Sequence, residues 1–287
     1  MAEVTVSMIK DLREKTSAGM MDCKKALEES GGDMNAAVDW LRQKGIVKAA
    51  KKADRVAASG LVAVVAKGGE ACIVEVNAET DFVAKNEKFQ NLVRLIAETA
   101  LAESGNFEAA SLAVKDELTN VIATIGENMA FRRAAVVKGD SVFTYVHNAL
   151  CPGMGQIGVA VAINGGNVAE VGPKIAMHIA ACRPEFVTVA DVDAAAVERE
   201  KKIFTESGAT AGKPEQVAEK MIAGRIQKYF AESVLEEQPF VIDPSKTIKK
   251  VLEECGGKLC GFAYFVLGEG IEKRADNLAD EVAKMLG

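Results

Sequence analysis

Residues 59–85 read SGLVAVVAKGGEACIVEVNAETDFVAK, and their pattern is the clearest indication of the fold class. Leu61–Val65 predicts a strand, Lys67–Glu70 a turn with two glycines, and Ala71–Val76 the returning strand of a β-hairpin. A polar loop over residues 77–86 then leads into a helix that we expect around residues 86–104. A short hairpin followed by one helix indicates an α+β fold with small antiparallel sheets.

A second part of the chain repeats this order. Ser141–Val146 and Ile157–Ile163 are predicted strands joined by a glycine-bearing connection, and a helix is predicted through Lys174–Cys182. The two parts agree in the order of their elements more than in residue identity. We therefore predict an internal β-β-α duplication.

The N-terminal segment has the helical period instead. Apolar residues recur at helical spacing in three short stretches, and Gly31-Gly32 separates the second from the third. Asp33 is expected to cap the third helix and Gly45 to end it. The basic, alanine-rich tract from Gly45 to Arg55 is interpreted as a linker. Three short helices can bury one small core, which has the size of a binding module.

The last third of the chain begins with helices. Val192–Ser207 and Pro214–Glu232 each carry apolar residues on one side and predict an inserted antiparallel helical hairpin. β-like segments follow around Pro239–Asp243 and Leu259–Leu267, and a helix over Glu272–Leu286 closes the chain. The predicted parts are 1–54 (helical module and basic linker), 55–140 (core subdomain one), 141–190 with 233–267 (core subdomain two), 191–232 (helical hairpin) and 268–287 (C-terminal helical module).

Composition argues against nucleic-acid and membrane partners. The net charge is −6, whereas phosphate binding needs a basic face. A solvated linker or contact with an acidic protein explains the strongest basic cluster better than RNA does, because no aromatic residue is interleaved among Lys44, Lys48, Lys51, Lys52 and Arg55. No apolar run reaches about 18 residues. The start of the chain does not resemble a signal peptide and the six cysteines are scattered, so a cytoplasmic protein with reduced thiols is expected.

Motifs for catalysis or cofactor binding are weak. Residues 153–158, GMGQIG, match the dinucleotide fingerprint, but a predicted strand follows them where the fingerprint needs a helix, so a hairpin loop is predicted. Gly208–Lys213 lacks the glycine spacing of a phosphate-binding loop. His147 and His178 have no second metal-type ligand beside them in sequence, and His178 is expected to pack in an apolar helix. We therefore expect no catalytic residue, cofactor or metal site.

The loop at Thr80–Lys85 admits two interpretations. In the first interpretation, Thr80 or Asp81 caps the following helix, and Phe82 packs that helix against the sheet as a hydrophobic staple. Alternatively, Phe82 beside a carboxylate at a loop tip is a wedge for a partner protein, since buried aromatic residues anchor interfaces. Capping is the simpler interpretation from the residues alone, and periodicity does not separate the two.

Several motifs, in collinear blocks along the whole chain, resemble those of the elongation factor Ts family. They are LREKT at 12–16, AGMMDCKKAL at 18–27, EVNAETDFVAK at 75–85, GEN at 126–128 with Arg132-Arg133, IAMHIAA at 175–181, QPF at 238–240 with PSK at 244–246, and GEGIEK at 268–273.

This resemblance implies a guanine-nucleotide exchange factor for the GTPase elongation factor Tu, not an enzyme. Residues 1–54 would be a ubiquitin-associated-like module that contacts the partner's GTPase domain, with Arg13, Met20 and Met21 on the contact face. The core would be two similar α+β core subdomains, and the C-terminal helix would pack on the GTPase domain too. His147 is a candidate for a further contact. A loop that we call the exchange loop would disturb the partner's Mg²⁺ and phosphate sites. That loop comprises Thr80, Asp81, Phe82 and Val83.

The chain would bind elongation factor Tu in both its GDP-bound and its nucleotide-free forms. The stoichiometry is left open, with a 2:2 assembly among the alternatives. Two rival functions remain: a ubiquitin-associated-like adaptor without exchange activity, which gives the exchange loop no role, and a nucleotide- or NAD-dependent enzyme built on residues 153–158.

Overall fold

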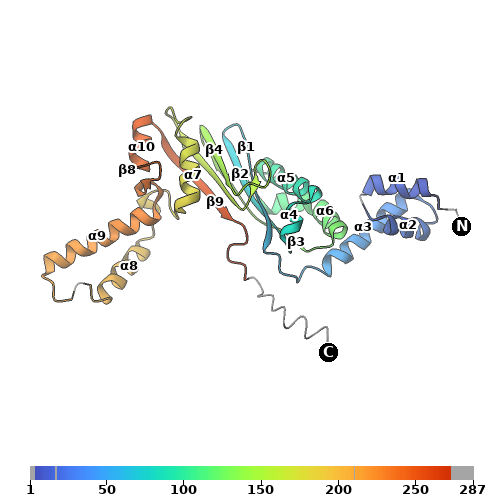
Figure 1. Ribbon diagram of the computed structural model, residues 1–287, viewed down its shortest axis with the longest axis horizontal. Helices are drawn as coiled ribbons and strands as arrows, with labels where there is room; N and C mark the ends of the chain where they lie inside the picture. The colour runs from blue at the N-terminus through green and yellow to red at the C-terminus, as the bar shows by residue number, and fades with distance from the viewer. Residues whose placement is uncertain (1–3, 17, 210, 273–287) are drawn as a thin grey trace. The chain divides into compact units, whose positions relative to one another are not determined.

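A computed structural model (Figure 1) describes residues 4–16, 18–209 and 211–272. The chain divides into two compact units. Unit 1 draws on residues 1–63, 74–134 and 266–287, and unit 2 on residues 64–73 and 135–265. Helices combined with small antiparallel sheets confirm the predicted α+β class.

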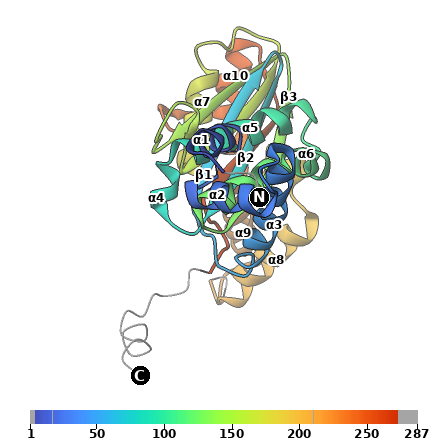
Figure 2. The ribbon, with the colours of Figure 1, turned by 90° about the vertical axis from the view of Figure 1, so that its right-hand side faces the viewer.

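Unit 1 begins with the three predicted helices, α1 (Val6–Thr16), α2 (Met20–Glu29) and α3 (Met34–Ala50), drawn in dark to mid blue in Figure 2. They contact one another around a small core formed by Ile9, Leu12, Cys23, Ala26, Leu27 and Ala37. The Asp33 carboxylate accepts a hydrogen bond from the Ala36 N–H at 2.8 Å, which confirms the predicted cap.

The predicted end of the third helix at Gly45 is wrong, because α3 continues to Ala50. Gly45 is buried, and a Cβ there would lie 3.5 Å from the Cβ of Ala123 on α6 (Phe107–Ile125). Glycine within a helix costs about 1 kcal/mol relative to alanine. Packing of α3 against α6 offsets that cost. Gly45 therefore permits a close contact between the two helices and does not end α3.

The basic cluster around the tract after Gly45 makes contacts within unit 1. Four residues of the basic cluster have partners within unit 1. The pairs are Lys48 with Asp22 (2.9 Å), Arg55 with Glu79 (3.5 Å), Lys52 with the Gly126 carbonyl oxygen, and Lys44 over the Trp40 ring (4.2 Å to the centroid). These contacts hold the tract to unit 1. The sequence analysis had considered a solvated linker, an acidic protein or RNA, but not contacts within the chain.

One sheet has the strand order β3-β2-β1-β5. Its strands are β1 (Ser59–Lys67), β2 (Glu70–Ala78), β3 (Met129–Lys138) and the two-residue β5 (Met154–Gly155). The neighbouring β1 and β2 confirm the predicted hairpin. A single turn of helix, α4 (Asp81–Ala84), and α5 (Glu87–Ala102) follow. The buried face of α5 carries Phe89, Leu92, Val93, Ile96, Ala97 and Ala100.

Unit 2 contains the second β-β-α sequence. β4 (Ser141–His147) pairs antiparallel with β6 (Ile157–Asn164), and β9 (Lys258–Val266) completes the order β4-β6-β9. Helix α7 (Gly172–Cys182) contacts β4 and β6. Residues 153–156 lie in the connection between β4 and β6, where Met154–Gly155 form β5, and residues 157–158 begin β6. A strand and not a helix follows this connection, as predicted, so no helix N-terminus is available there for a dinucleotide.

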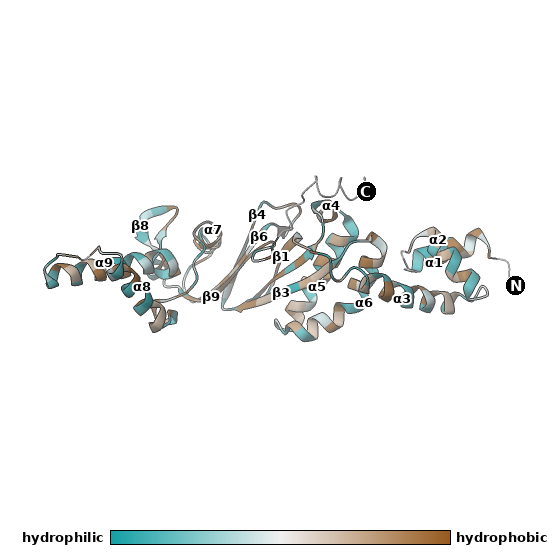
Figure 3. Ribbon diagram, turned by 90° about the horizontal axis from the view of Figure 1, so that it is seen from below, coloured by the Kyte–Doolittle hydropathy of each residue, from teal (hydrophilic) through white to brown (hydrophobic). Residues whose placement is uncertain are grey.

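The predicted helical hairpin is also confirmed. It consists of α8 (Ala194–Glu206) and α9 (Glu215–Ser233), both of which carry hydrophobic and hydrophilic residues (Figure 3). Arg225 donates to the Glu200 carboxylate at 2.7 Å and joins the two helices. Short 3₁₀ turns at Val189–Asp191 and Leu235–Glu237 flank the hairpin.

After the hairpin come β7 (Pro239–Phe240), β8 (Asp243–Thr247) and α10 (Ile248–Cys255). The sequence interpretation missed α10, whose cap is the Thr247 hydroxyl, an acceptor for the Lys250 N–H at 3.3 Å. The predicted helix over 272–286 falls almost wholly outside the described residues. Within the part of the chain that the structure covers, no helix has the length and apolarity needed to span a membrane.

His178 is fully buried on α7, as its apolar surroundings predicted. Both ring nitrogens have hydrogen-bond partners. Nδ1 accepts the Val241 N–H at 3.2 Å, so the proton resides on Nε2, which donates to Gln238 Oε1 at 2.8 Å. Burial lowers the pKa of His178, and the bond with Gln238 offsets this only in part.

The chain should therefore lose stability in mildly acidic buffer. Because the folded-state pKa of His178 is lowered, the unfolded chain binds more protons once the pH falls below about 6.5. The stability that neutral His178 contributes is complete above that pH and is lost as the pH drops through the folded-state pKa. Urea unfolding at pH 8 and pH 5 should show a smaller loss for His178→Gln than for the original chain. Equal losses in both proteins would contradict this.

Candidate functional site

The exchange loop presents one large apolar ring to solvent. Phe82 is 78% exposed and Asp81 is exposed, while Val83 and Ala84 on the same helical turn are buried. The staple interpretation of Phe82 is therefore wrong. Val83 and Ala84 anchor α4 in unit 1, and the turn leaves the neighbouring Phe82 pointing outward.

The capping interpretation is wrong as well. Asn86, not Thr80 or Asp81, caps α5 by accepting the Lys88 N–H at 2.9 Å. Thr80 precedes α4, but its side chain makes no cap bond. The helix expected around residues 86–104 corresponds to α5, so its start was predicted correctly, whereas the single turn α4 lies in the segment that was interpreted as a polar loop.

Thr80 instead bonds to a carboxylate from another segment. The Thr80 N–H donates to Glu127 Oε2 at 3.0 Å, and its hydroxyl donates to Glu127 Oε1 at 2.7 Å. In return, Glu79 Oε1 accepts the Asn128 N–H at 2.5 Å. We call Glu79, Thr80, Glu127 and Asn128 the loop clamp. These reciprocal bonds hold the base of the exchange loop to the turn that precedes β3.

The clamp extends to the basic tract. The side-chain amide of Asn128 donates to the carbonyl oxygens of Arg55 at 2.6 Å and Ala53 at 3.3 Å. Site prediction from the sequence assigned Glu127 and Asn128 no role. The only signal for them was the GEN motif at 126–128, which contributed to the family resemblance without a function.

The predicted contact residues of the N-terminal helices are accessible. Arg13 lies on the exposed side of α1, while Met20 and Met21 begin α2 with exposed fractions of 48% and 77%. Arg13 and Met20 line one depression together with Lys10 and Glu14. Flexible thioether side chains adapt to an apolar partner surface.

His147 belongs to unit 2, whereas the other predicted site residues belong to unit 1. It is exposed at the end of β4, where Nδ1 lies 3.2 Å from the Tyr145 hydroxyl. Among residues 4–16, 18–209 and 211–272, no three His, Cys, Asp or Glu side chains gather as a metal site would require.

Comparison with known proteins decides the family. Residues 79–269 match the family model described as Elongation factor TS. Elongation factor Ts of Hyphomonas neptunium is 53% identical over 297 residues, which cover 99% of each chain. The same-named proteins of Paramagnetospirillum magneticum and Paracoccus denitrificans are each 52% identical, covering 100% and 98% of this chain and 98% of their own lengths. The chain belongs to the elongation factor Ts family.

Membership makes it an elongation factor of protein biosynthesis. The span that matches the family model contains the exchange loop, the loop clamp and His147. Arg13, Met20 and Met21 lie before that span, but within the alignment to relatives of the elongation factor Ts family that covers nearly the whole chain.

Proposed function

We propose that the chain binds GDP-bound elongation factor Tu and promotes the exchange of GDP for GTP without chemically transforming either. The observation that carries this proposal is Phe82, exposed on an anchored turn in a member of the elongation factor Ts family. Exposure of a large ring to water is unfavourable for the free chain. A partner that covers the ring recovers that free energy.

Exchange requires only that the factor bind the nucleotide-free partner more tightly than the loaded one. Each tenfold loss of nucleotide affinity needs about 1.4 kcal/mol of coupling between the two ligands. By the same linkage, nucleotide weakens binding of the factor by an equal ratio.

In this proposal Phe82 enters between side chains of the partner and displaces a helix. Asp81, exposed beside it, acts with the displaced helix on the Mg²⁺ site, and the phosphate loop then loses its hold on GDP. The loop clamp supports this mechanism, because Phe82 can displace a partner helix only if the base of the exchange loop stays fixed. A simple adaptor has no need of a clamped loop with an exposed ring.

The N-terminal helices supply a second contact in this proposal. Arg13, Met20 and Met21 bind the GTPase domain, and core subdomain two, with His147, reaches another domain of the partner. The division into subdomains at 55–140 and at 141–190 with 233–267 is part of the same proposal. The accessibility of Arg13, Met20, Met21 and His147 supports it.

The experiment is the release of fluorescent GDP from elongation factor Tu, followed by stopped flow with and without the chain. A release rate that rises with the concentration of the chain and saturates is expected. No acceleration at any concentration would refute exchange activity and favour the adaptor.

Loss of the clamp should slow exchange. Glu127→Ala removes the acceptor for both Thr80 bonds, so the loop base becomes mobile and the maximal release rate should fall about tenfold, the equivalent of one charged hydrogen bond. The matched control is Glu117→Ala, an exposed carboxylate on α6, which should leave the rate unchanged. A normal rate in Glu127→Ala would remove the clamp from the mechanism.

A further inference from the structure

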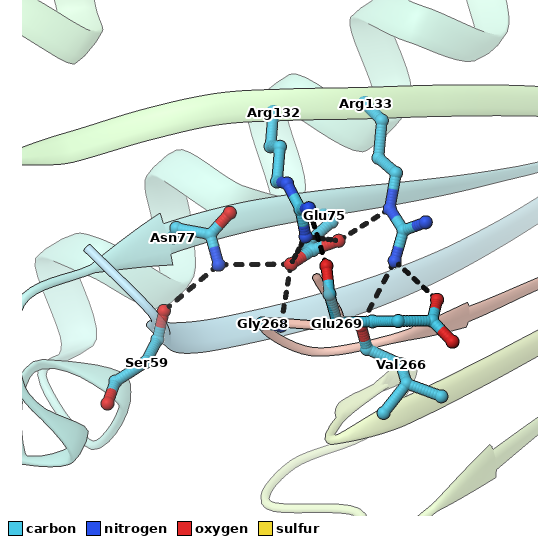
Figure 4. Close-up of polar contacts among 8 residues, drawn as sticks. All are labelled: Ser59, Glu75, Asn77, Arg132, Arg133, Val266, Gly268 and Glu269. Carbon is cyan, nitrogen blue, oxygen red and sulfur yellow. Dashed lines mark hydrogen bonds and ion pairs between the residues drawn. The ribbon is translucent and has the colours of Figure 1, made fainter. Parts of the chain in front are cut away.

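A fully buried carboxylate lies on β2, five residues before the exchange loop begins. Glu75 has no exposed surface, and polar groups surround it on several sides (Figure 4). Its oxygens accept hydrogen bonds from the Asn77 amide (3.0 Å), from Arg132 (3.0 and 3.2 Å), from Arg133 (2.6 Å) and from the Gly268 N–H (2.7 Å).

These bonds keep Glu75 ionised. Burial by itself would raise the pKa of Glu75, but the hydrogen bonds from Gly268, Asn77, Arg133 and Arg132 outweigh it and hold the pKa below its ordinary value. The carboxylate therefore carries its charge throughout the physiological pH range. A buried ion pair of this kind contributes little net stability compared with apolar packing, and its clearest value is in fixing one arrangement.

The ion pairs of Glu75 fix the position of residues 266–269. Val266 is the last residue of β9, and residues 267–269 follow it. Arg132 donates to the Glu269 carbonyl oxygen at 2.5 Å. Arg133 donates to the Val266 carbonyl oxygen at 3.0 Å and to the Glu269 carboxylate at 3.3 Å. Both arginines, on β3, thus bridge Glu75 to this turn, as Figure 4 shows.

The backbone of the turn is shaped for the same contact. Gly268 has φ +71°, and a Cβ there would lie 2.4 Å from the Ala58 carbonyl oxygen. Only glycine brings the chain this close in that conformation. The Gly268 N–H is thereby presented to Glu75. An anion site is a poor alternative, because Glu75 and Glu269 already balance the charges of the two arginines.

We propose that Glu75 is a positioning residue that fixes the turn at residues 266–269, and that nucleotide exchange depends on the placement of this turn. The second half rests on the proposed function. The first half concerns the free chain and can be tested without a partner. The hydrogen-bond partners of Glu75 lie outside the exchange loop, so its effect should be on binding of the partner and not on the maximal rate.

The test of the first half is amide hydrogen exchange of the free full-length chain. In Glu75→Gln the acceptor becomes neutral, so the amides of residues 267–271 should exchange about tenfold faster, while those of α5 and α6 keep their protection. If Glu75→Gln fails to fold, Arg132→Lys replaces it, because Arg132 is partly exposed. This variant should also speed hydrogen exchange of the amides of residues 267–271. Glu70→Gln is the control: it removes a carboxylate of β2 that pairs with Lys138 at 2.9 Å but remains partly exposed.

The test of the second half is GDP release from elongation factor Tu. Glu75→Gln should raise the half-saturating concentration about tenfold and leave the maximal rate unchanged, with Glu70→Gln normal in both. Unchanged amide protection in both variants would overturn the placement. Faster amide exchange with normal half-saturation, or a loss of rate that simply follows a lowered melting temperature, would overturn the role in exchange. If the original chain does not release GDP, the proposed function fails, and amide exchange alone decides the placement.

Discussion

Phe82→Ala is expected to slow GDP release from elongation factor Tu about a hundredfold at saturating protein. An aromatic anchor in an interface contributes about 2–4 kcal/mol, and each 1.4 kcal/mol changes a rate tenfold. The lost contact favours the nucleotide-free partner over the loaded one, so the maximal rate falls and not merely the affinity. Stopped-flow release of fluorescent GDP measures it.

Stability should hardly change in the same variant. Phe82 is 78% exposed in the free chain, and such surface substitutions usually stay within about 0.5 kcal/mol. The matched control is Phe89→Ala on α5, whose ring is fully buried and whose loss should cost about 3–5 kcal/mol. Asp81→Ala should show a milder defect that depends on Mg²⁺ concentration. A stable Phe82→Ala protein with undiminished GDP release would remove the wedge from the mechanism.

The double variant Met20→Asp, Met21→Asp should raise the half-saturating concentration about fiftyfold. Both side chains are exposed at the start of α2, so the charges should be tolerated in the free chain. In the complex the carboxylates would lose part of their hydration against an apolar surface, and a fiftyfold rise corresponds to a total cost of about 2.3 kcal/mol. Titration of the GDP release rate gives both the half-saturating concentration and the maximal rate.

The maximal rate of that double variant should remain normal, because the exchange loop is untouched. Leu112→Asp is the control: Leu112 on α6 is 74% exposed but lies outside the proposed contact. If the control and the double variant behave alike, the N-terminal helices are not a specific recognition surface.

Much of the fold followed from local patterns. The change from a period of about 3.6 to a period of two marked the hairpin of β1 and β2, and Asp33 marked the start of α3. Gly45 failed as a stop signal because its effect depends on a neighbour, Ala123, that is distant in sequence. Helix α10 was missed because eight residues are too few to establish a period.

The site was harder to predict for the same physical reason. Apolar Phe82 next to a cap-like Thr80 is compatible with burial or exposure, and only tertiary structure distinguishes them. The partner of Thr80 is Glu127, which is 47 residues away, and Glu75 meets Gly268 across 193 residues. No local pattern predicts such pairs. Resemblance to the elongation factor Ts family singled out the exchange loop, but the bonds that hold it became visible only in the structure.

An exchange factor must bind the nucleotide-free GTPase more tightly than the loaded one. Titration calorimetry with elongation factor Tu, stripped of nucleotide or saturated with GDP and Mg²⁺, measures both affinities directly. Much tighter binding to the stripped form is expected, by the same factor by which the chain weakens GDP binding. Equal affinity for the two forms would contradict it, because a ligand that binds both states alike shifts neither.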